Sequence, residues 1–509
     1  MDGRTRARIG LALTTAVGVA AALLATPAAG DDAGPTPDPT GVAWAPCPPD
    51  LLVTTPLECG TVTVPLDYDE PAGAQIEIWV SRLAAADPEE RQGVLLTNPG
   101  GPGHSGLSQP ADLATRGIAT SVLDAYDVIG MDPRGVGRSA PVSCGFTSDQ
   151  EYWGNVPPFA PDAAAVARHA EVSKGVAAQC ADQDDEGHLA HISTANAARD
   201  MDRIRVALGE EKISYFGASY GTALGAAYAT LFPERTDRVV LDSNLGGPAL
   251  DRDAQRRFAP GLEDRFGDFA RWAAQRHPTY GLGRTPREVR ANFVALAERL
   301  DRSPVAGIDG ATFRFFMFSA TYADSSFTMI APLWQSLADG DARAAARNAA
   351  TLETARPEQA RAGSPVPHDN TLSAYLAYVC NDTDWPEDVA TYQRDVAADR
   401  ARYPLYGGAA ANINPCAFWA DPAEAPLVID DEGPRNVLVL QNLRDPGTPH
   451  RGGELARAAF GDRARLVSVD AGGHGVYVYG GNACAQNTAT TFLLTGALPR
   501  TDVRCRADA

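Results

Sequence analysis

The stretch "YFGASYGTALG", residues 215–225, places a serine between two glycines directly after an apolar run. The preceding "KISYF", residues 212–216, is typical of a buried strand, and "TALGAAYATLF", residues 222–232, predicts a helix that ends before Pro233. A serine on such a strand-to-helix turn takes a strained backbone conformation, and the flanking glycines let neighbouring elements approach it. The pattern predicts a nucleophile at Ser219, at the carboxyl edge of a sheet and the positive end of a helix. The alternative is a tight glycine turn with an incidental serine.

Apolar runs around this turn predict the fold class. "GVLLTNP" (93–99), "YDVIGMDP" (126–133) and "RVVLDSN" (238–244) are continuous and are separated by helix-length segments, as parallel strands covered on both faces are. Before them, "CGTVTVPLDY" (59–68) and "AQIEIWVSRL" (74–83) alternate apolar and polar residues and predict an antiparallel hairpin. We therefore predict an α/β fold with a mostly parallel central sheet and helices on both faces.

The middle of the chain breaks this alternation. Residues 250–430 contain helical, aromatic-containing segments, which predict an inserted helical cap. Strand patterns return after residue 430 at "NVLVLQN" and "ARLVSVD", so residues 431–509 should complete the sheet begun by residues 51–249. Residues 31–50 are rich in proline and aperiodic, and they predict an extended lead-in.

The first thirty residues predict a cleaved secretory signal. Three arginines precede the apolar stretch "IGLALTTAVGVAAALLA", and small residues follow up to Ala29 and Gly30. An uncleaved membrane anchor is the alternative, but the stretch is rich in Ala, Thr and Gly, and Asp31 and Asp32 follow at once. We expect a secreted protein.

Eight cysteines agree with export, because an even number in an exported protein favours four disulfides over eight free thiols. The sequence alone leaves their connectivity open. They fall into four local couples: Cys47 with Cys59, Cys144 with Cys180, Cys380 with Cys416, and Cys484 with Cys505. No CxxC or HExxH motif occurs, so we predict no metal and no cofactor.

The net charge of −20 and the sequence pI near 4.8 argue against nucleic acid and against stable association with an anionic membrane. Both partners require basic patches. An acidic surface would instead weakly attract cationic ligands. Nothing in the sequence indicates an oligomeric state.

A serine hydroxyl needs a base to take its proton. When the serine lies on such a strand-to-helix turn, called a nucleophile elbow, the acid and then the histidine follow it along the chain. "VLVLQNLRDPGTP" supplies Asp445 just beyond an apolar strand, and "RLVSVDAGGHG" supplies His474 in a glycine-rich loop after the next strand. Other carboxylates near these strands are Asp470, Asp430 and Asp431. Asp470 should still be at the end of its strand, where it is less well placed to reach the imidazole.

The same chemistry needs hydrogen-bond donors for an oxyanion. One should be the backbone N–H of Tyr220, which follows the nucleophile. The second should come from the loop "NPGGPGHSG", residues 98–106, whose glycines leave N–H groups free to face a ligand. We predict Gly101 as this donor, with Gly100 as the alternative.

Five motifs together resemble a known family: "NPGGPGHSG", "YDVIGMDPRGVGRS", "ISTANAARDMDRIRVALGEEKISYFGASYGT", "RDPGTP" and "GGHG". In this order they are similar to the motifs of secreted actinobacterial tripeptidyl aminopeptidases, α/β-hydrolase serine exopeptidases related to prolyl iminopeptidases. The resemblance runs from about residue 40 to the C-terminus and is weak through the cap. Asn98 stands where the prolyl iminopeptidases have the histidine of "HGGPG", which favours the tripeptidyl branch.

The resemblance implies an α/β-hydrolase fold with Ser219 as nucleophile, Asp445 as orienting acid and His474 as base. Its implied substrates are peptides with a free N-terminus, so the pocket needs an anion that binds the amine. Candidates in the cap are Asp324, Asp382 and Asp384, although most carboxylates on a protein are solvated surface. Asp132 and Arg134 of "DPRGVGRS" are interpreted as part of a structural loop beneath the site.

Two other functions compete with this interpretation. The same triad hydrolyses esters more easily than amides, so a secreted serine carboxylesterase acting on ester or acylated natural-product substrates is the alternative. A non-catalytic binding protein on the same fold would have lost its triad, whereas all three residue types are present here. Dehalogenases and epoxide hydrolases carry an aspartate on the elbow, which Ser219 argues against.

Overall fold

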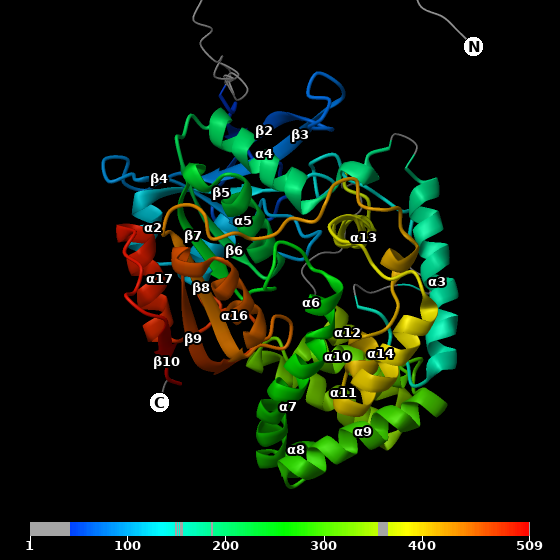
Figure 1. Ribbon diagram of the computed structural model, residues 1–509. Coiled ribbons are helices and arrows are strands. Elements are labelled where there is room, and N and C mark those ends of the chain that lie inside the picture. Colours follow the sequence, from blue (N-terminus) through cyan, green and yellow to red (C-terminus); the bar gives the residue numbers. More distant parts are fainter. Residues whose placement is uncertain are drawn as a thin grey trace, which may run out of the picture. The chain divides into compact units, whose positions relative to one another are not determined.

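The computed structural model describes residues 41–507, apart from 148–149, 151, 153–155, 185–186 and 355–364. The expected signal peptide and the first ten residues of the expected lead-in lie outside the described residues. A ten-stranded sheet forms the centre, in the order β1-β2-β3-β5-β4-β6-β7-β8-β9-β10 (Figure 1). Its strands are β1 (Ala45–Pro46), β2 (Glu58–Pro65), β3 (Gln75–Leu83), β4 (Gly93–Asn98), β5 (Tyr126–Met131), β6 (Ile213–Ala218), β7 (Thr236–Asp242), β8 (Val437–Arg444), β9 (Ala464–Gly472) and β10 (Val503–Cys505).

The predicted hairpin is present at one edge of this sheet. β2 and β3 pair antiparallel from Glu58 opposite Arg82 to Pro65 opposite Gln75, and β3 pairs antiparallel with β5. From β5 through β4 to β10, every neighbouring pair is parallel. The mostly parallel sheet is therefore confirmed, and the structure adds two short strands that the sequence patterns did not indicate, β1 and β10.

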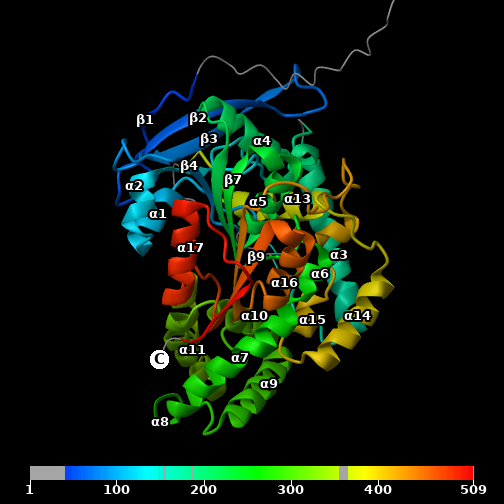
Figure 2. The ribbon, with the colours of Figure 1, turned by 60° about the vertical axis from the view of Figure 1, so that its left-hand side comes forward.

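Helices cover both faces of the sheet because successive strand residues point to opposite sides. Leu95 of β4 belongs to a core under α1 (Gln109–Arg116), α2 (Thr120–Ala125) and α17 (Ala483–Thr495). Its neighbours Val94 and Leu96 belong to a core under α4 (Thr194–Ala207), α5 (Tyr220–Leu231) and α16 (His450–Ala459). Figure 2 shows the two sets on opposite sides of the strands.

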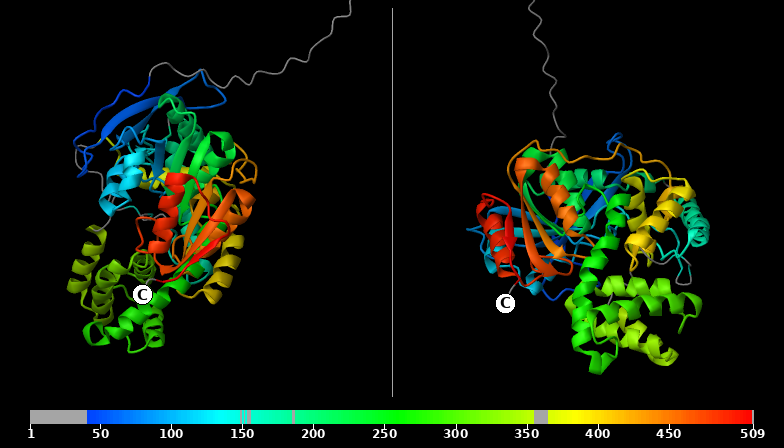
Figure 3. Two further views of the ribbon diagram at one scale, coloured as in Figure 1. Left: turned by 90° about the vertical axis from the view of Figure 1, so that its left-hand side faces the viewer. Right: turned by 60° about the horizontal axis from the view of Figure 1, so that its bottom comes forward.

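A run of helices between β7 and β8 gathers beyond one end of the sheet (Figures 1 and 3). Its interior is aromatic. The Phe269 ring stacks on the Trp334 ring with a centroid distance of 5.7 Å, and the Phe293 ring packs edge-on against the same indole with a centroid distance of 5.6 Å. The helices are α6 (Arg252–Arg256), α7 (Phe258–Gln275), α8 (His277–Tyr280), α9 (Pro286–Arg302), α10 (Gly310–Ala320), α11 (Phe327–Asp339), α12 (Ala342–Thr354), α13 (Asn370–Asn381), α14 (Val389–Arg402) and α15 (Gly407–Ala410). Short 3₁₀ turns are η1 (Leu189–His191), η2 (Pro233–Arg235), η3 (Asp324–Ser326), η4 (Pro415–Phe418) and η5 (Gly461–Arg463).

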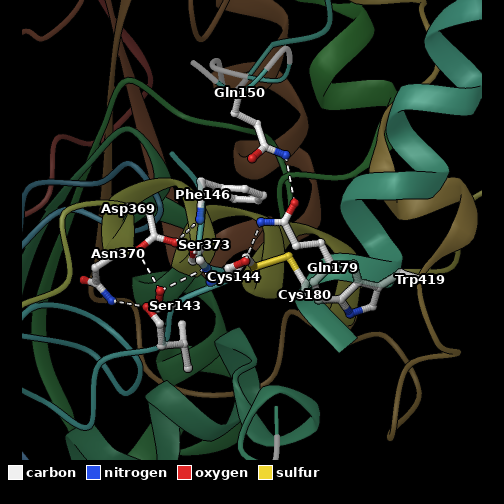
Figure 4. The surroundings of a disulfide bond; sticks show 12 residues. Ser143, Cys144, Phe146, Gln150, Gln179, Cys180, Asp369, Asn370, Ser373 and Trp419 are labelled. Carbon is white, nitrogen blue, oxygen red and sulfur yellow. Dashed lines mark hydrogen bonds between the residues drawn. A yellow bond between two sulfur atoms is a disulfide. The ribbon is translucent and has the colours of Figure 1, made fainter. Parts of the chain in front are cut away.

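Helix α3 (Ala163–Asp182) comes from the long connection between β5 and β6, yet it packs against α14 and η4 rather than on the sheet. The disulfide between Cys144 and Cys180 ties its last turn to this connection (Figure 4). Beside that disulfide, Phe146 N–H donates to the Asp369 carboxylate at 3.0 Å, immediately before α13. The connection therefore belongs to the helical layer as much as to the sheet.

All eight cysteines are paired within the local couples noted above. Each disulfide spans between 12 and 36 residues of sequence. In the described part of the chain, no helix is both long enough and apolar enough to span a membrane.

Candidate active site

Ser219 lies on the turn between β6 and α5 with φ +58° and ψ −124°. A residue with a side chain adopts this positive φ only at a cost of about 1–2 kcal/mol, so the surrounding contacts must impose it. Ser219 N–H donates to Asp242 O at 2.9 Å. A Cβ at Gly221 would lie 2.6 Å from Asn98 O, and a Cβ at Gly217 would collide with Gly221 O. The two flanking glycines therefore let the turn pack closely against its neighbours, and Ser219 stays only half-buried.

His474 follows β9 and faces Asp445, which follows β8. Its Nδ1 lies 3.0 Å from both carboxylate oxygens of Asp445. Asp445 is 1% exposed and also accepts hydrogen bonds from the N–H groups of Gly447 and Thr448 and from the Thr448 hydroxyl, each at 2.9 Å. These donors hold the carboxylate in place, where it can orient the imidazole and accept the Nδ1 proton in a hydrogen bond.

Electrostatics at His474 suit a base. Burial by itself lowers the pKa of the imidazole, but the charge and hydrogen bond of Asp445, with a smaller contribution from Asp242, raise it above its ordinary value. The side chain remains 17% exposed. The imidazole can therefore take up a proton, and the Asp445 carboxylate at Nδ1 stabilises the resulting cation.

The other carboxylates considered as the acid lie elsewhere. Asp470 pairs with Arg444 at 2.7 Å and is 45% exposed, and Arg444 lowers its pKa. Asp430 lies 3.6 Å from the Arg463 guanidinium, and Asp431 is exposed. Of the predicted acids, the structure brings only Asp445 into hydrogen-bond contact with His474 within the described residues.

The loop after β4 reaches over the serine. A Cβ at Gly100 would lie 2.9 Å from Ser219 Cβ and 3.1 Å from Tyr220 N, and Gly100 has φ +100°. Gly100 N–H already donates to Asn98 Oδ1 at 2.9 Å. The N–H groups of Gly101 and Tyr220 donate to no protein acceptor among the described residues. This arrangement favours Gly101 over Gly100 as the second donor to an oxyanion.

Two residues that sequence reasoning missed hold the histidine loop. Tyr322, between α10 and α11, accepts the His474 N–H on its carbonyl at 2.8 Å, and its ring lies 4.8 Å from the imidazole. Asn442 of β8 donates through its side chain to Gly473 O and Gly475 O, both at 3.0 Å. No spacing signal marks Tyr322, because it comes from the irregular helical region.

The three acidic candidates for amine binding have different surroundings. Asp382 accepts from Thr194 N–H at 2.7 Å and from the Thr194 hydroxyl at 2.5 Å, and burial raises the pKa of Asp382 to about 7. Asp324 pairs with Arg265 but keeps 76% of its side chain exposed. Asp384 is exposed. Asp324 is the nearest of them in sequence to Tyr322 and its contact with His474.

The loop with Asp132 and Arg134 is a buried polar cluster. The Arg134 guanidinium pairs with Asp200 at 2.6 Å with both side chains buried. Asp132 accepts from the Ser105 hydroxyl at 2.5 Å and from Gly106 N–H at 3.0 Å. The contacts of Asp132 anchor the end of the loop that connects β4 to α1. Across the described ranges, no group of three His, Cys, Asp or Glu side chains is placed to bind a metal.

The sheet order, the serine elbow and the His474–Asp445 pair define a serine hydrolase of the α/β-hydrolase fold. Residues 93–310 match the family model described as alpha/beta hydrolase fold, and residues 403–505 match the model described as TAP-like protein. A tripeptidyl aminopeptidase from Streptomyces coelicolor is 35% identical over 92% of this chain and 86% of that protein. The chain belongs to the tripeptidyl aminopeptidase family of serine hydrolases.

Two mycobacterial relatives show the range of names in this family. Serine protease Hip1 from Mycobacterium tuberculosis is 30% identical over 91% of this chain and 91% of that protein. A protein from the same species named carboxylesterase B is 32% identical over 93% of this chain and 92% of that protein. The relatives thus support serine peptidase activity and also include an esterase by name.

Proposed function

We propose that this protein is a secreted serine exopeptidase that releases short peptides, with tripeptides as the expected product, from free N-termini. The observation that carries the proposal is the His474–Asp445 pair, whose loop is bound to the serine turn: Val476 N–H donates to the Asp242 carboxylate, and Ser219 N–H donates to the Asp242 carbonyl. Among the described residues, the N–H groups of Gly101 and Tyr220 donate to no protein acceptor, so they are free to bind an oxyanion. The names of the relatives at 35% and 30% identity support a peptide substrate. Four disulfides support export, because such bonds persist in oxidising compartments.

In the proposed mechanism, Ser219 Oγ attacks the scissile carbonyl carbon while its proton passes to His474 Nε2. The N–H groups of Tyr220 and Gly101 stabilise the oxyanion of the tetrahedral intermediate. The intermediate collapses when the C–N bond breaks, and the leaving amine takes the proton from Nε2. Water then attacks the acyl-enzyme by the same route and releases the peptide acid and free Ser219. Asp445 stabilises the imidazolium throughout.

The test compares the wild type with Ser219→Ala on three substrates: a fluorogenic tripeptide amide with a free amine, its N-acetylated form and a short-chain ester. We expect hydrolysis of the free tripeptide, a large loss on acetylation and no activity in the variant. Turnover of the acetylated form at the same rate would contradict recognition of the amine. Activity that survives in Ser219→Ala would contradict the nucleophile.

A carboxylesterase is the second candidate, favoured by the relative named carboxylesterase B. Its substrates would be ester or acylated natural products, cleaved by the same steps with an alcohol as the leaving group. Turnover of the ester alone, abolished in Ser219→Ala, would support this candidate and exclude the peptidase.

A further inference from the structure

A buried arginine, Arg265, forms hydrogen bonds to the turn that carries Tyr322. Both belong to the helical region, defined as the helices α6 to α15 between β7 and β8. Arg265 of α7 is 1% exposed. Its Nε donates to Thr321 O at 2.9 Å, its Nη1 donates to Asp268 at 2.7 Å, and its Nη2 pairs with Asp324. One guanidinium therefore binds both sides of the turn between α10 and α11. A buried charge of this kind is stable only when its hydrogen bonds are made, so the turn is held in one position.

This turn meets the proposed base directly. Between Thr321 and Asp324, the carbonyl of Tyr322 accepts the His474 N–H at 2.8 Å, and the phenol ring packs on the imidazole at a centroid distance of 4.8 Å. A backbone hydrogen bond and a ring contact fix two different parts of His474. Hence the position of the base depends on the helical region as well as on β9.

The two glycines before His474 allow its loop to lie directly against the Tyr322 turn and Arg265. Gly473 has φ +98°, and a Cβ there would lie 2.8 Å from Tyr322 O. A Cβ at Gly472 would collide with the guanidinium of Arg265 and the carboxylate of Asp268. The loop before the imidazole thus lies against the same arginine that holds the turn.

The network also reaches β8, whose last residue directly precedes the proposed acid. Asp268 accepts from Arg444 Nε at 3.0 Å, and Arg444 directly precedes Asp445. Arg444 pairs in addition with Asp470 at 2.7 Å, and Arg271 pairs with Asp268. The direct charged partners of Arg265 are therefore Asp268 and Asp324. Arg271 and Arg444 lie one contact further away, and Asp470 follows Arg444.

We propose that Arg265 is a positioning residue for the base: through the Tyr322 turn it sets the orientation of His474 toward Ser219 and Asp445. The proposal rests on the proposed function of Ser219 and His474 as nucleophile and base. It also gives Asp324 a different role from amine binding, because its carboxylate works through Arg265. The helical region then completes the reacting site rather than only covering it.

The experiment compares Arg265→Met with Arg314→Met. Arg314 is a matched control because it is a buried arginine of the same helical region, 3% exposed, pairs with Asp301 at 3.1 Å and lies over the Phe159 ring. In Arg265→Met, Asp268 keeps Arg271 and Arg444 as partners, so the variant leaves no isolated charge at that position. Kinetics are measured on a p-nitrophenyl ester and on the free tripeptide amide, below the melting temperature of each variant.

We expect kcat to fall about 10- to 100-fold in Arg265→Met on both substrates, because a shift of about 1 Å at a reacting group can cost about 100-fold. KM should stay within about threefold, and Arg314→Met should retain kcat within about threefold. In Arg265→Met, His474 should contact Asp445 less closely, and its pKa should fall because Asp445 is what raises it. The acid limb of the pH profile of kcat/KM should therefore move to lower pH. If Arg265 only stabilised the fold, the pH of this acid limb would be the same in Arg265→Met and in the wild type.

Asp324→Asn provides a second test, in which the substituted side chain is exposed rather than buried. We expect a fall in kcat on the ester and on the peptide alike. A rise in KM confined to the free-amine peptide would overturn the positioning role and support amine binding. Equal kinetics in Arg265→Met and Arg314→Met, with Ser219→Ala inactive, would overturn this inference alone. An active Ser219→Ala would overturn the proposed function instead.

Discussion

Substituting Gly100 by alanine tests the proposed oxyanion role of the loop after β4, residues 98–106, at its closest contact with the Ser219 turn. The new Cβ would lie 2.6 Å from Ala218 O and 2.9 Å from Ser219 Cβ. Because non-bonded carbon atoms rest about 3.5–4.0 Å apart, the loop must move by roughly 0.5–1 Å away from the elbow. That movement would carry the Gly101 N–H out of hydrogen-bond reach of an oxyanion.

The expected loss is one oxyanion donor. Such a donor contributes about 100- to 1000-fold in kcat, or about 2.7–4 kcal/mol. We therefore expect Gly100→Ala to lower kcat about 100-fold on both ester and peptide, with KM changed by less than about threefold. Steady-state kinetics provide the measurement, and thermal melting shows that the variant is folded.

Gly117→Ala is the matched control. Gly117 ends α1 with φ +88°, and a Cβ there would meet nothing within 4 Å. Alanine in a left-handed conformation costs about 1–2 kcal/mol of stability at either position, so both variants should melt lower. If Gly100→Ala kept kcat within about threefold of Gly117→Ala, the loop after β4 would not supply an oxyanion donor.

Three further outcomes follow from the hydrogen bonds and pKa shifts of the site. Thr448→Val removes the hydroxyl that donates to Asp445 at 2.9 Å, and we expect kcat to fall about tenfold, or about 1.4 kcal/mol. An unchanged kcat would show that this hydroxyl does not help to position Asp445. The kcat/KM profile should lose activity as pH falls through the raised pKa of His474, so its acid limb should lie above the ordinary value of 6.5. Burial raises the pKa of Asp382 to about 7, so the folded carboxyl keeps a proton that the unfolded one releases near pH 4, and stability falls as pH rises between these values. Melting temperatures from pH 5 to 8 should show a smaller decline in Asp382→Asn. Other groups with raised pKa values contribute to the remaining decline, among them His474 and Asp242, whose pKa burial raises to about 7. An identical slope in the variant would contradict the assignment.

The parallel strands could be predicted because burial on both faces leaves a direct trace in the sequence. All six residues of β4 and all six of β6 are buried, and both strands consist mostly of apolar or small residues without a charged side chain. β10 has only three residues, of which Cys505 alone is buried, so it carries no such pattern. Its partner β9 lies well upstream, and only the fold reveals the pairing.

The central residues of the site were predictable for a topological reason. A serine elbow fixes the chain order of acid and histidine, so Asp445 and His474 could be selected from their positions after strands. Asn98, Tyr322 and Arg265 could not be selected in this way. Their roles depend on contacts between segments that no periodicity relates, and the same holds for α3, which leaves the sheet to pack on α14.

The position of the helical insertion between β7 and β8 has a consequence for when activity arises. The elbow with Ser219 precedes the insertion, whereas the proposed acid and base follow it on the loops after β8 and β9. A chain still being synthesised, or one whose last strands have not docked on β7, carries a serine with no group to take its proton. On the proposed mechanism, hydrolytic activity therefore requires that β8 and β9 have joined the sheet.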